Sequence, residues 1–191
     1  MTELSGILLA GGQSARMQTD KARLFYHGME QYRYVAKMLS AQCKDVHIAC
    51  RQDQNFDINC IYDLPEMAGI GPAAAWFSAY ETLGHAFVIV GIDYPLFNEQ
   101  ELQNLIQERD PQADASVLFN AQTGFYEPML GIYEWSFYQK LVSFKQEPII
   151  SIQTILRNSQ VKKVLPLNKN AIISIDNPEQ YQSILKSLNE K

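Results

Sequence analysis

The chain has 191 residues, of which 47% are hydrophobic and 19% are charged, so a single globular domain over residues 1–191 is expected. Its 16 basic and 21 acidic residues give a formal net charge of −5, which argues against a nucleic-acid-binding face. No apolar run approaches the ~20 residues of a membrane helix, and no signal-peptide pattern opens the chain. A cytoplasmic protein that binds neither nucleic acid nor membranes is therefore expected.

Apolar runs of strand length alternate with helical patterns, which is typical of an α/β fold with a mainly parallel sheet. In chain order, we expect strand 4–10, an extended piece 24–26, helix 30–42, strands 46–50 and 60–62, helix 73–82, strand 86–92, helix 99–107, strands 115–119 and 129–133, helix 135–143 and a terminal helix from Pro178.

Several side chains in these elements have predicted structural roles. Asn98 is expected to cap the helix that follows it, and Glu101 is expected to complete a capping box. Trp76 and Trp135 are expected in the core. The residues of the last helix that should face the body are Tyr181, Ile184, Leu185 and Leu188.

The most informative stretch begins where the first expected strand ends, at Gly11 and Gly12. Glycines adopt backbone angles closed to other residues and let the main chain approach a ligand, and exposed N–H groups in such loops bind anions. Ser14, Arg16 and Lys21 follow, and the two cations add positive charge. The stretch predicts a loop that cradles a polyphosphate. The alternative is a simple turn, where glycine pairs are also common.

This stretch resembles the signature L-A-G-G-x-S-x-R-M-G-x-D-K of molybdenum cofactor guanylyltransferases, which belong to the MobA-like nucleotidyltransferase family. The matching residues are Leu9, Ala10, Gly11, Gly12, Ser14, Arg16, Met17, Asp20 and Lys21. Gln18 stands where the family has glycine. The resemblance implies a three-layer, Rossmann-like α/β fold with a mainly parallel, mixed sheet. It also implies catalytic roles for Arg16 and Lys21, and nucleotide contacts from Leu9, Ala10, Gly11, Gly12, Ser14 and Lys21.

A carboxylate follows the clearest buried strand, because Asp93 comes directly after the apolar run 87–92 and precedes Tyr94 and Pro95. Mg²⁺ prefers one or two carboxylates together with phosphate oxygens and water, which makes Asp93 a candidate magnesium ligand. The alternative is an aspartate that only shapes a turn. The family has a metal-binding aspartate in a C-D-x-P-type segment here. The resemblance therefore implies that Asp93 binds Mg²⁺ and the nucleotide and takes part in catalysis.

Asp63 ends the expected strand 60–62 and precedes Gly71 and Pro72, which resemble the start of a family helix. Ala75 replaces a family glycine in that helix, and the stretch 46–51 lacks an asparagine that the family often has there. A carboxylate can accept hydrogen bonds from the N1 and N2 donors of guanine. The resemblance implies that Asp63 recognises the base, and an aspartate in an exposed loop is the alternative.

Near the C-terminus, residues 174–179 resemble the family segment N-x-N-T-P-E, with Ser174 and Asp176 in place of both asparagines. The second position supplies a metal-facing oxygen in some related nucleotidyltransferases. Asp176 is therefore a second candidate Mg²⁺ ligand. Helix capping by Asp176 or Asn177 is the alternative, and it is the interpretation that this pattern favours.

The resemblance implies transfer of GMP from GTP to molybdopterin, with release of pyrophosphate and with Mg²⁺ as cofactor. Molybdoenzymes or other proteins of cofactor biosynthesis are further expected partners. Relatives that use CTP tend to show L-A-A-G, so Gly11 after Ala10 favours GTP. Two alternatives stay open: a transferase that uses CTP or another nucleotide, and a nucleotide-binding regulator without turnover.

Overall fold

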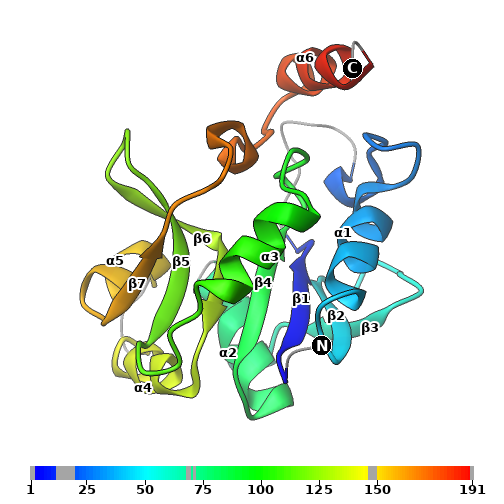
Figure 1. Cartoon of the computed structure of the whole chain (residues 1–191). Coiled ribbons are helices and arrows are strands. Elements are labelled where there is room, and N and C mark those ends of the chain that lie inside the picture. The colour runs from blue at the N-terminus through cyan, green and yellow to red at the C-terminus, as the bar shows by residue number, and fades with distance from the viewer. Residues whose placement is uncertain (1–2, 12–19, 68–69, 71, 146–149, 190–191) are drawn as a thin grey trace.

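The computed structural model describes residues 3–11, 20–67, 70, 72–145 and 150–189. The strands of this part are β1 (Ser5–Leu9), β2 (Asp45–Cys50), β3 (Asn59–Tyr62), β4 (Phe87–Gly91), β5 (Ala115–Asn120), β6 (Phe125–Tyr133) and β7 (Val161–Val164). They form one sheet with the order β3-β2-β1-β4-β6-β5-β7 (Figure 1). β6 runs antiparallel to β4 and β5, and the other pairs are parallel. The predicted mixed, mainly parallel sheet is confirmed.

Helices cover both faces of this sheet. They are α1 (Gln31–Ser40), α2 (Ala73–Leu83), α3 (Glu99–Gln107), α4 (Trp135–Ser143), α5 (Ile152–Arg157) and α6 (Pro178–Asn189), with short 3₁₀ turns η1 (Lys21–Arg23), η2 (Pro65–Met67) and η3 (Lys169–Ile172). The first core cluster joins α1, α3 and η3 to one face, and the second joins α2, α4 and α5 to the other. The predicted three-layer α/β architecture is confirmed.

The strand β4 shows why the sheet is buried on both sides. Successive side chains of a strand point to opposite faces, and all five residues of β4 are apolar or glycine and buried. Val88 and Val90 lie in the first core cluster, whereas Phe87 and Ile89 lie in the second. Such continuous apolar runs are typical of central strands covered by helices on both faces.

Most predicted elements begin and end close to the predicted residues, with three differences. The strand predicted over 129–133 begins at Phe125. Neither α5 nor β7 was predicted, because elements of six and four residues carry too little periodicity. Trp76 is buried as predicted, but the prediction for Trp135 was wrong. Trp135 is 45% exposed at the first position of α4, where its ring lies against Tyr80 and Tyr138.

The capping-box prediction at α3 was half right. The Asn98 side chain accepts a hydrogen bond from the Glu101 N–H at 3.1 Å, as expected of a cap. The Glu101 carboxylate, however, accepts from the backbone N–H groups of Leu167 (3.0 Å) and Asn168 (2.7 Å). Glu101 therefore anchors the segment that follows β7 and leads back across the sheet toward α6.

The terminal helix α6 lies beyond the sheet edge at which β1 ends (Figure 1). Its apolar residues pack on Leu24 and Tyr26, in the segment between η1 and α1, as predicted for the side facing the body. The Tyr26 and Tyr181 rings meet edge to face, with centroids 5.1 Å apart. No helix within the described ranges combines the length and apolar character needed to cross a membrane.

Candidate functional site

A cavity of about 430 Å³ opens at the carboxyl ends of β1, β2 and β4, beside the start of α2. This is the place where open α/β sheets bind ligands, because the loops after parallel strands converge there. The lining residues are Leu9, Ala10, Gly11, Lys21, Ala49, Cys50, Asp63, Pro72, Ala75, Trp76, Ile92, Asp93 and Met129. They include every described residue that the sequence marked as a nucleotide ligand: Leu9, Ala10, Gly11, Lys21, Asp63 and Asp93.

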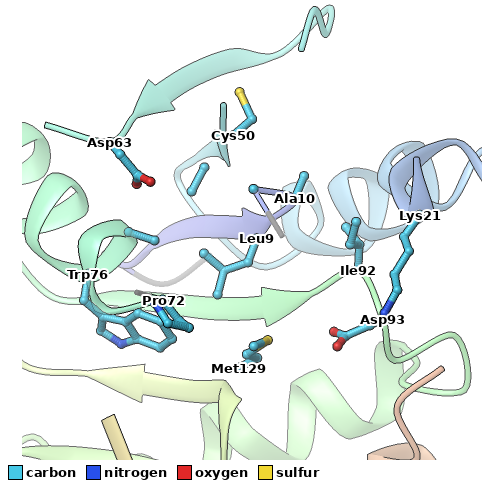
Figure 2. A pocket seen from close by; sticks show the side chains of 13 residues that line it. Leu9, Ala10, Lys21, Cys50, Asp63, Pro72, Trp76, Ile92, Asp93 and Met129 are labelled. Atoms are coloured by element: carbon cyan, nitrogen blue, oxygen red, sulfur yellow. The ribbon is translucent and has the colours of Figure 1, made fainter. Parts of the chain in front are cut away.

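The cavity has two polar ends and an apolar middle. Figure 2 shows Asp63 at one end and Asp93 with Lys21 at the other, with Leu9 between them and Trp76 on the side of Asp63. An apolar trough with a few polar groups at fixed positions is typical of small-molecule sites. The charges are also divided between the ends, because Lys21, the only cation among the described lining residues, lies at the Asp93 end.

Asp93 is held at its end of the cavity by the strand that precedes it. Gly91 closes β4, and the Asp93 carboxylate folds back over this glycine, so that an added Cβ there would lie only 2.6 Å from Asp93 Oδ1. Burial raises the pKa of Asp93 to about 6; the positive charge of Lys21 opposes this rise, and the negative charge of Asp176 adds to it. A cation bound beside this partly buried carboxyl would favour its ionised form.

Lys21 reaches the cavity from the 3₁₀ turn η1. Asp20 caps this turn by accepting from the Ala22 N–H at 3.0 Å, and its second oxygen accepts from Gln54 Nε2 at 2.9 Å. The Lys21 ammonium donates to Asp176 Oδ1 at 2.8 Å. The Lys21 side chain is 18% exposed and that of Asp176 is 51% exposed, so a ligand phosphate entering the cavity could exchange with Asp176.

The C-terminal segment is tied directly to the Asp93 turn. The Ile175 N–H donates to the Asp93 carbonyl at 2.8 Å, which places Asp176 beside Lys21. The capping role belongs to Asn177, whose side chain accepts from the Gln180 N–H at 2.9 Å. Of the two capping residues weighed in the sequence, the one that caps is therefore Asn177, and Asp176 keeps its carboxylate at the site.

Asp63 lies directly after β3, at the opposite end of the cavity from Asp93 (Figure 2). The residue is exposed, and partial desolvation by the surrounding protein raises the pKa of its carboxyl. The next residue is fixed to α2, because the Leu64 N–H donates to Ser78 Oγ at 3.0 Å. This contact fixes the chain directly after Asp63, and Asp63 itself lines the cavity. Its carboxylate can accept hydrogen bonds from a ligand that lies along the trough.

The glycine loop is described only in part. Gly11 lines the cavity, and its φ is not in the left-handed region. An added Cβ on Gly11 would lie 3.8 Å from the Ala49 carbonyl oxygen, an ordinary contact. Space for a ligand, rather than backbone strain, is therefore what this glycine provides. Gly12, Ser14 and Arg16 lie outside the described residues.

Sequence reasoning missed part of the cavity wall. Trp76 was expected only in the core, yet this buried side chain also lines the cavity, as does Cys50 at the end of β2. Met129 enters from β6, a strand on which no functional residue was predicted. Position at a strand end could have indicated Cys50. Met129 lies in the middle of its strand and carries no such signal.

Comparisons with known proteins place these features in context. Residues 6–168 match the family model described as the MobA-like NTP transferase domain. The chain is 26% identical to a probable molybdenum cofactor guanylyltransferase of Bacillus cereus strain Q1 over 203 residues, with 100% of both chains covered.

A second curated relative is longer than this chain. It is the molybdenum cofactor biosynthesis bifunctional protein of Synechocystis sp., which is 27% identical over 188 residues. The match covers 96% of this chain and 54% of that protein, so the chain spans about half the length of this relative.

A solved structure also resembles the chain. Molybdopterin-guanine dinucleotide biosynthesis protein A from Archaeoglobus fulgidus superposes with a TM-score of 0.81 at 19% identity, covering 98% of this chain and 100% of that one. At this identity, the likeness shows the fold.

Proposed function

Because this chain belongs to the family of MobA-like NTP transferase domains, we propose that it transfers GMP from GTP to molybdopterin and releases pyrophosphate. The observation that carries the proposal is the cavity with two polar ends. Its Asp63 end suits the donors of guanine, and its Lys21 and Asp93 end suits phosphates with a divalent cation. The names of the similar proteins, two of which refer to guanylyl or guanine dinucleotide chemistry, support the same substrates.

The transfer requires little covalent chemistry from the protein. The terminal phosphate of molybdopterin attacks the α-phosphorus of GTP, the bond from that phosphorus to the α,β-bridging oxygen breaks, and pyrophosphate leaves. In phosphoryl chemistry, alignment and charge neutralisation dominate catalysis. Lys21 would exchange Asp176 for a phosphate oxygen and stabilise negative charge on the departing pyrophosphate. The main chain of Gly11 would approach the phosphates without a side chain in the way.

The residues at this end fit Mg²⁺. Within the described ranges, no three His, Cys, Asp or Glu side chains gather into a metal-binding group. This agrees with an ion that takes one or two protein carboxylates and completes its shell with phosphate oxygens and water. Asp93 would hold the ion, and Asp176 would offer a second carboxylate. When bound, the ion supplies charge neutralisation between the reacting phosphates.

Replacing Asp63 with alanine tests the base end of the cavity. We expect wild-type protein to bind GTP more tightly than ATP, CTP or UTP, and Asp63→Ala to reduce this preference by about tenfold, since a lost pair of hydrogen bonds is worth 1–2 kcal/mol. Titration of each nucleotide with Mg²⁺ measures the preference. The matched control is Asp53→Ala, an exposed aspartate paired with Arg51 at 2.9 Å. Equal affinities of the wild type for all four nucleotides would exclude guanine recognition.

Replacing Gly91 with alanine tests how the Asp93 carboxylate is seated. The new Cβ would lie 2.6 Å from Asp93 Oδ1 and 3.0 Å from Met129 Cβ. We expect a loss of about 1–3 kcal/mol in the free energy of unfolding, as for other overpacked sites, and a weaker effect of Mg²⁺ on nucleotide binding. Urea unfolding and nucleotide titrations with and without Mg²⁺ measure both effects.

The control for Gly91→Ala is Gly6→Ala in β1, away from the cavity lining. The new Cβ would lie 3.0 Å from Leu39 Cβ on α1. This variant should lose stability and keep the effect of Mg²⁺. If Gly91→Ala kept the effect of Mg²⁺ on nucleotide binding as fully as Gly6→Ala, the Asp93 carboxylate would not need its observed position.

Turnover separates the transferase from a nucleotide-binding regulator. Purified protein with GTP, Mg²⁺ and molybdopterin should release one pyrophosphate for each molybdopterin guanine dinucleotide formed. Nucleotide binding without pyrophosphate release would favour the regulator. Equal release from CTP would favour a transferase of broader specificity.

A further inference from the structure

We propose that Glu127 is a positioning residue for the transfer, because it fixes the turn that carries Asp93 through the Tyr94 hydroxyl. Glu127 lies on β6, three residues before Leu130, which pairs with Val90 near the end of β4. The Tyr94 hydroxyl donates to Glu127 Oε2 at 3.2 Å. This inference rests on the proposed role of Asp93 as the residue that holds Mg²⁺ with the nucleotide.

An irregularity in β6 brings Glu127 to this position. The pairing of β5 with β6 passes from Val117↔Gly131 to Phe119↔Tyr126, so β6 contains extra residues at Glu127–Met129. Pro128 cannot donate a ladder hydrogen bond, so proline in a central strand is confined to such irregular positions. Bulges of this kind redirect side chains and are frequent beside active sites.

Hydrogen bonds hold the irregular segment in place. The Tyr133 hydroxyl donates to the Pro128 carbonyl at 2.5 Å, and Tyr133 is fully buried. The carbonyl of Tyr126, the residue before Glu127, accepts from Gln153 Nε2 at 3.4 Å. With its backbone held, the segment directs Met129 into the cavity and leaves Glu127 at the Tyr94 hydroxyl.

Tyr94 links Glu127 to the Asp93 carboxylate through a shared contact with Gly91. A Cβ added at Gly91 would lie 3.2 Å from Tyr94 Cδ2 and 2.6 Å from Asp93 Oδ1, so both side chains lie over the same glycine. Tyr94 is 6% exposed, and a buried phenol that loses its partner carries a desolvation penalty. The bond to Glu127 therefore favours one ring position, which in turn limits where the carboxylate can lie.

Stability alone does not account for a carboxylate at position 127. Burial raises the pKa of Glu127 and the negative charge of Asp93 adds to this rise, whereas hydrogen bonds to Tyr94 and Asn120 lower it. Partly buried charges of this kind are costly, and an apolar residue of similar size is often at least as stable. Residues such as Glu127, which an apolar side chain could replace without loss of stability, are expected at functional sites.

The test compares Glu127→Ala, Tyr94→Phe and Glu127→Gln in titrations of fluorescent GTP against Mg²⁺. Glu127→Ala and Tyr94→Phe should each raise the Mg²⁺ concentration for half-maximal binding about fivefold, the usual effect of one lost hydrogen bond. GTP binding without Mg²⁺ should stay unchanged. Glu127→Gln retains an acceptor oxygen and should remain within about twofold of wild type. The double variant should be no worse than either single variant, because both remove the same bond.

The matched control is Tyr138→Phe, which removes a comparable hydroxyl-to-carboxylate hydrogen bond to Glu81 outside the cavity lining. It should leave the Mg²⁺ requirement unchanged. If Glu127→Ala and Tyr94→Phe lowered only the melting temperature while Asp93→Asn abolished the effect of Mg²⁺, the inference would fail and the proposed function would stand. If Mg²⁺ did not affect GTP binding in the wild type, both would fail.

Discussion

Asp93→Asn is expected to lower Mg²⁺-dependent transfer at least 10³-fold, since loss of a principal charge-stabilising group typically costs 10²–10³ and this change also removes a metal ligand. The carboxyl is partly buried at the end of the cavity that Lys21 lines, within the electrostatic influence of Lys21. The measurement is pyrophosphate release at saturating GTP and Mg²⁺. Asp176→Asn is the matched variant and should do much less, because its side chain is half exposed and asparagine stands at the corresponding family position. Comparable losses in both variants would contradict the assignment of Asp93 as the principal ligand.

The same substitution should stabilise the protein when no ligand is bound. Asp93 has a folded-state pKa of about 6, whereas an unfolded aspartate has a pKa of about 3.9. Below about pH 4 the carboxyl is protonated in both the folded and the unfolded state, so it does not change the free energy of unfolding. Between about pH 4 and pH 6 the unfolded carboxyl ionises while the folded one stays protonated, so the free energy of unfolding falls, and this fall is complete above pH 6. Asp93→Asn is therefore expected to increase the free energy of unfolding by about 1–3 kcal/mol at pH 7.5 and by little near pH 4.

Urea unfolding at the two pH values, with a chelator present, measures this difference. A variant that is less stable than wild type at pH 7.5 would show that the Asp93 carboxylate contributes favourably to the ligand-free fold. In that case, this partly buried acid would have a structural role.

Lys21→Ala is expected to lower turnover by about 10²–10³ while the fold remains intact, because Lys21 would stabilise charge that develops on the leaving pyrophosphate. Its partner Asp176 is half exposed, so loss of the ion pair should change the free energy of unfolding by no more than about 1 kcal/mol. The measurements are kcat and the urea midpoint. The control is Lys162→Ala, which breaks another ion pair, to Glu108 at 3.2 Å, outside the cavity lining. If Lys21→Ala kept wild-type turnover, the assignment of Lys21 to the nucleotide phosphates would be wrong.

Rules about strand ends predicted much of the site from sequence. Buried parallel strands place the residues that follow them at one edge of the sheet, which is why Gly11, Asp63 and Asp93 could be grouped without a structure. They lie around one cavity, as that argument requires. Leu9 and Lys21 were added by the family resemblance. Periodicity likewise placed the long elements, because a helix or strand with one buried face repeats its apolar residues regularly.

The remaining features depend on long-range contacts that local patterns do not encode. Glu101 has the spacing of a capping box, but it accepts from Leu167 and Asn168, which lie far along the chain. The irregular segment of β6 depends on Tyr133 reaching back to Pro128. Trp135 looked like a core residue by type, and its exposure follows from its position at the start of α4.

We propose that one cavity holds guanine at Asp63 and the phosphates with Mg²⁺ at Lys21 and Asp93. A crystal structure with a non-hydrolysable GTP analogue and Mg²⁺ tests it most directly. We predict the guanine N1 and N2 within about 3 Å of the Asp63 carboxylate. We also predict Mg²⁺ within about 5 Å of the Asp93 carboxylate, by direct or water-bridged contact. An ion farther than that from both Asp93 and Asp176, or a base bound away from Asp63, would contradict the account.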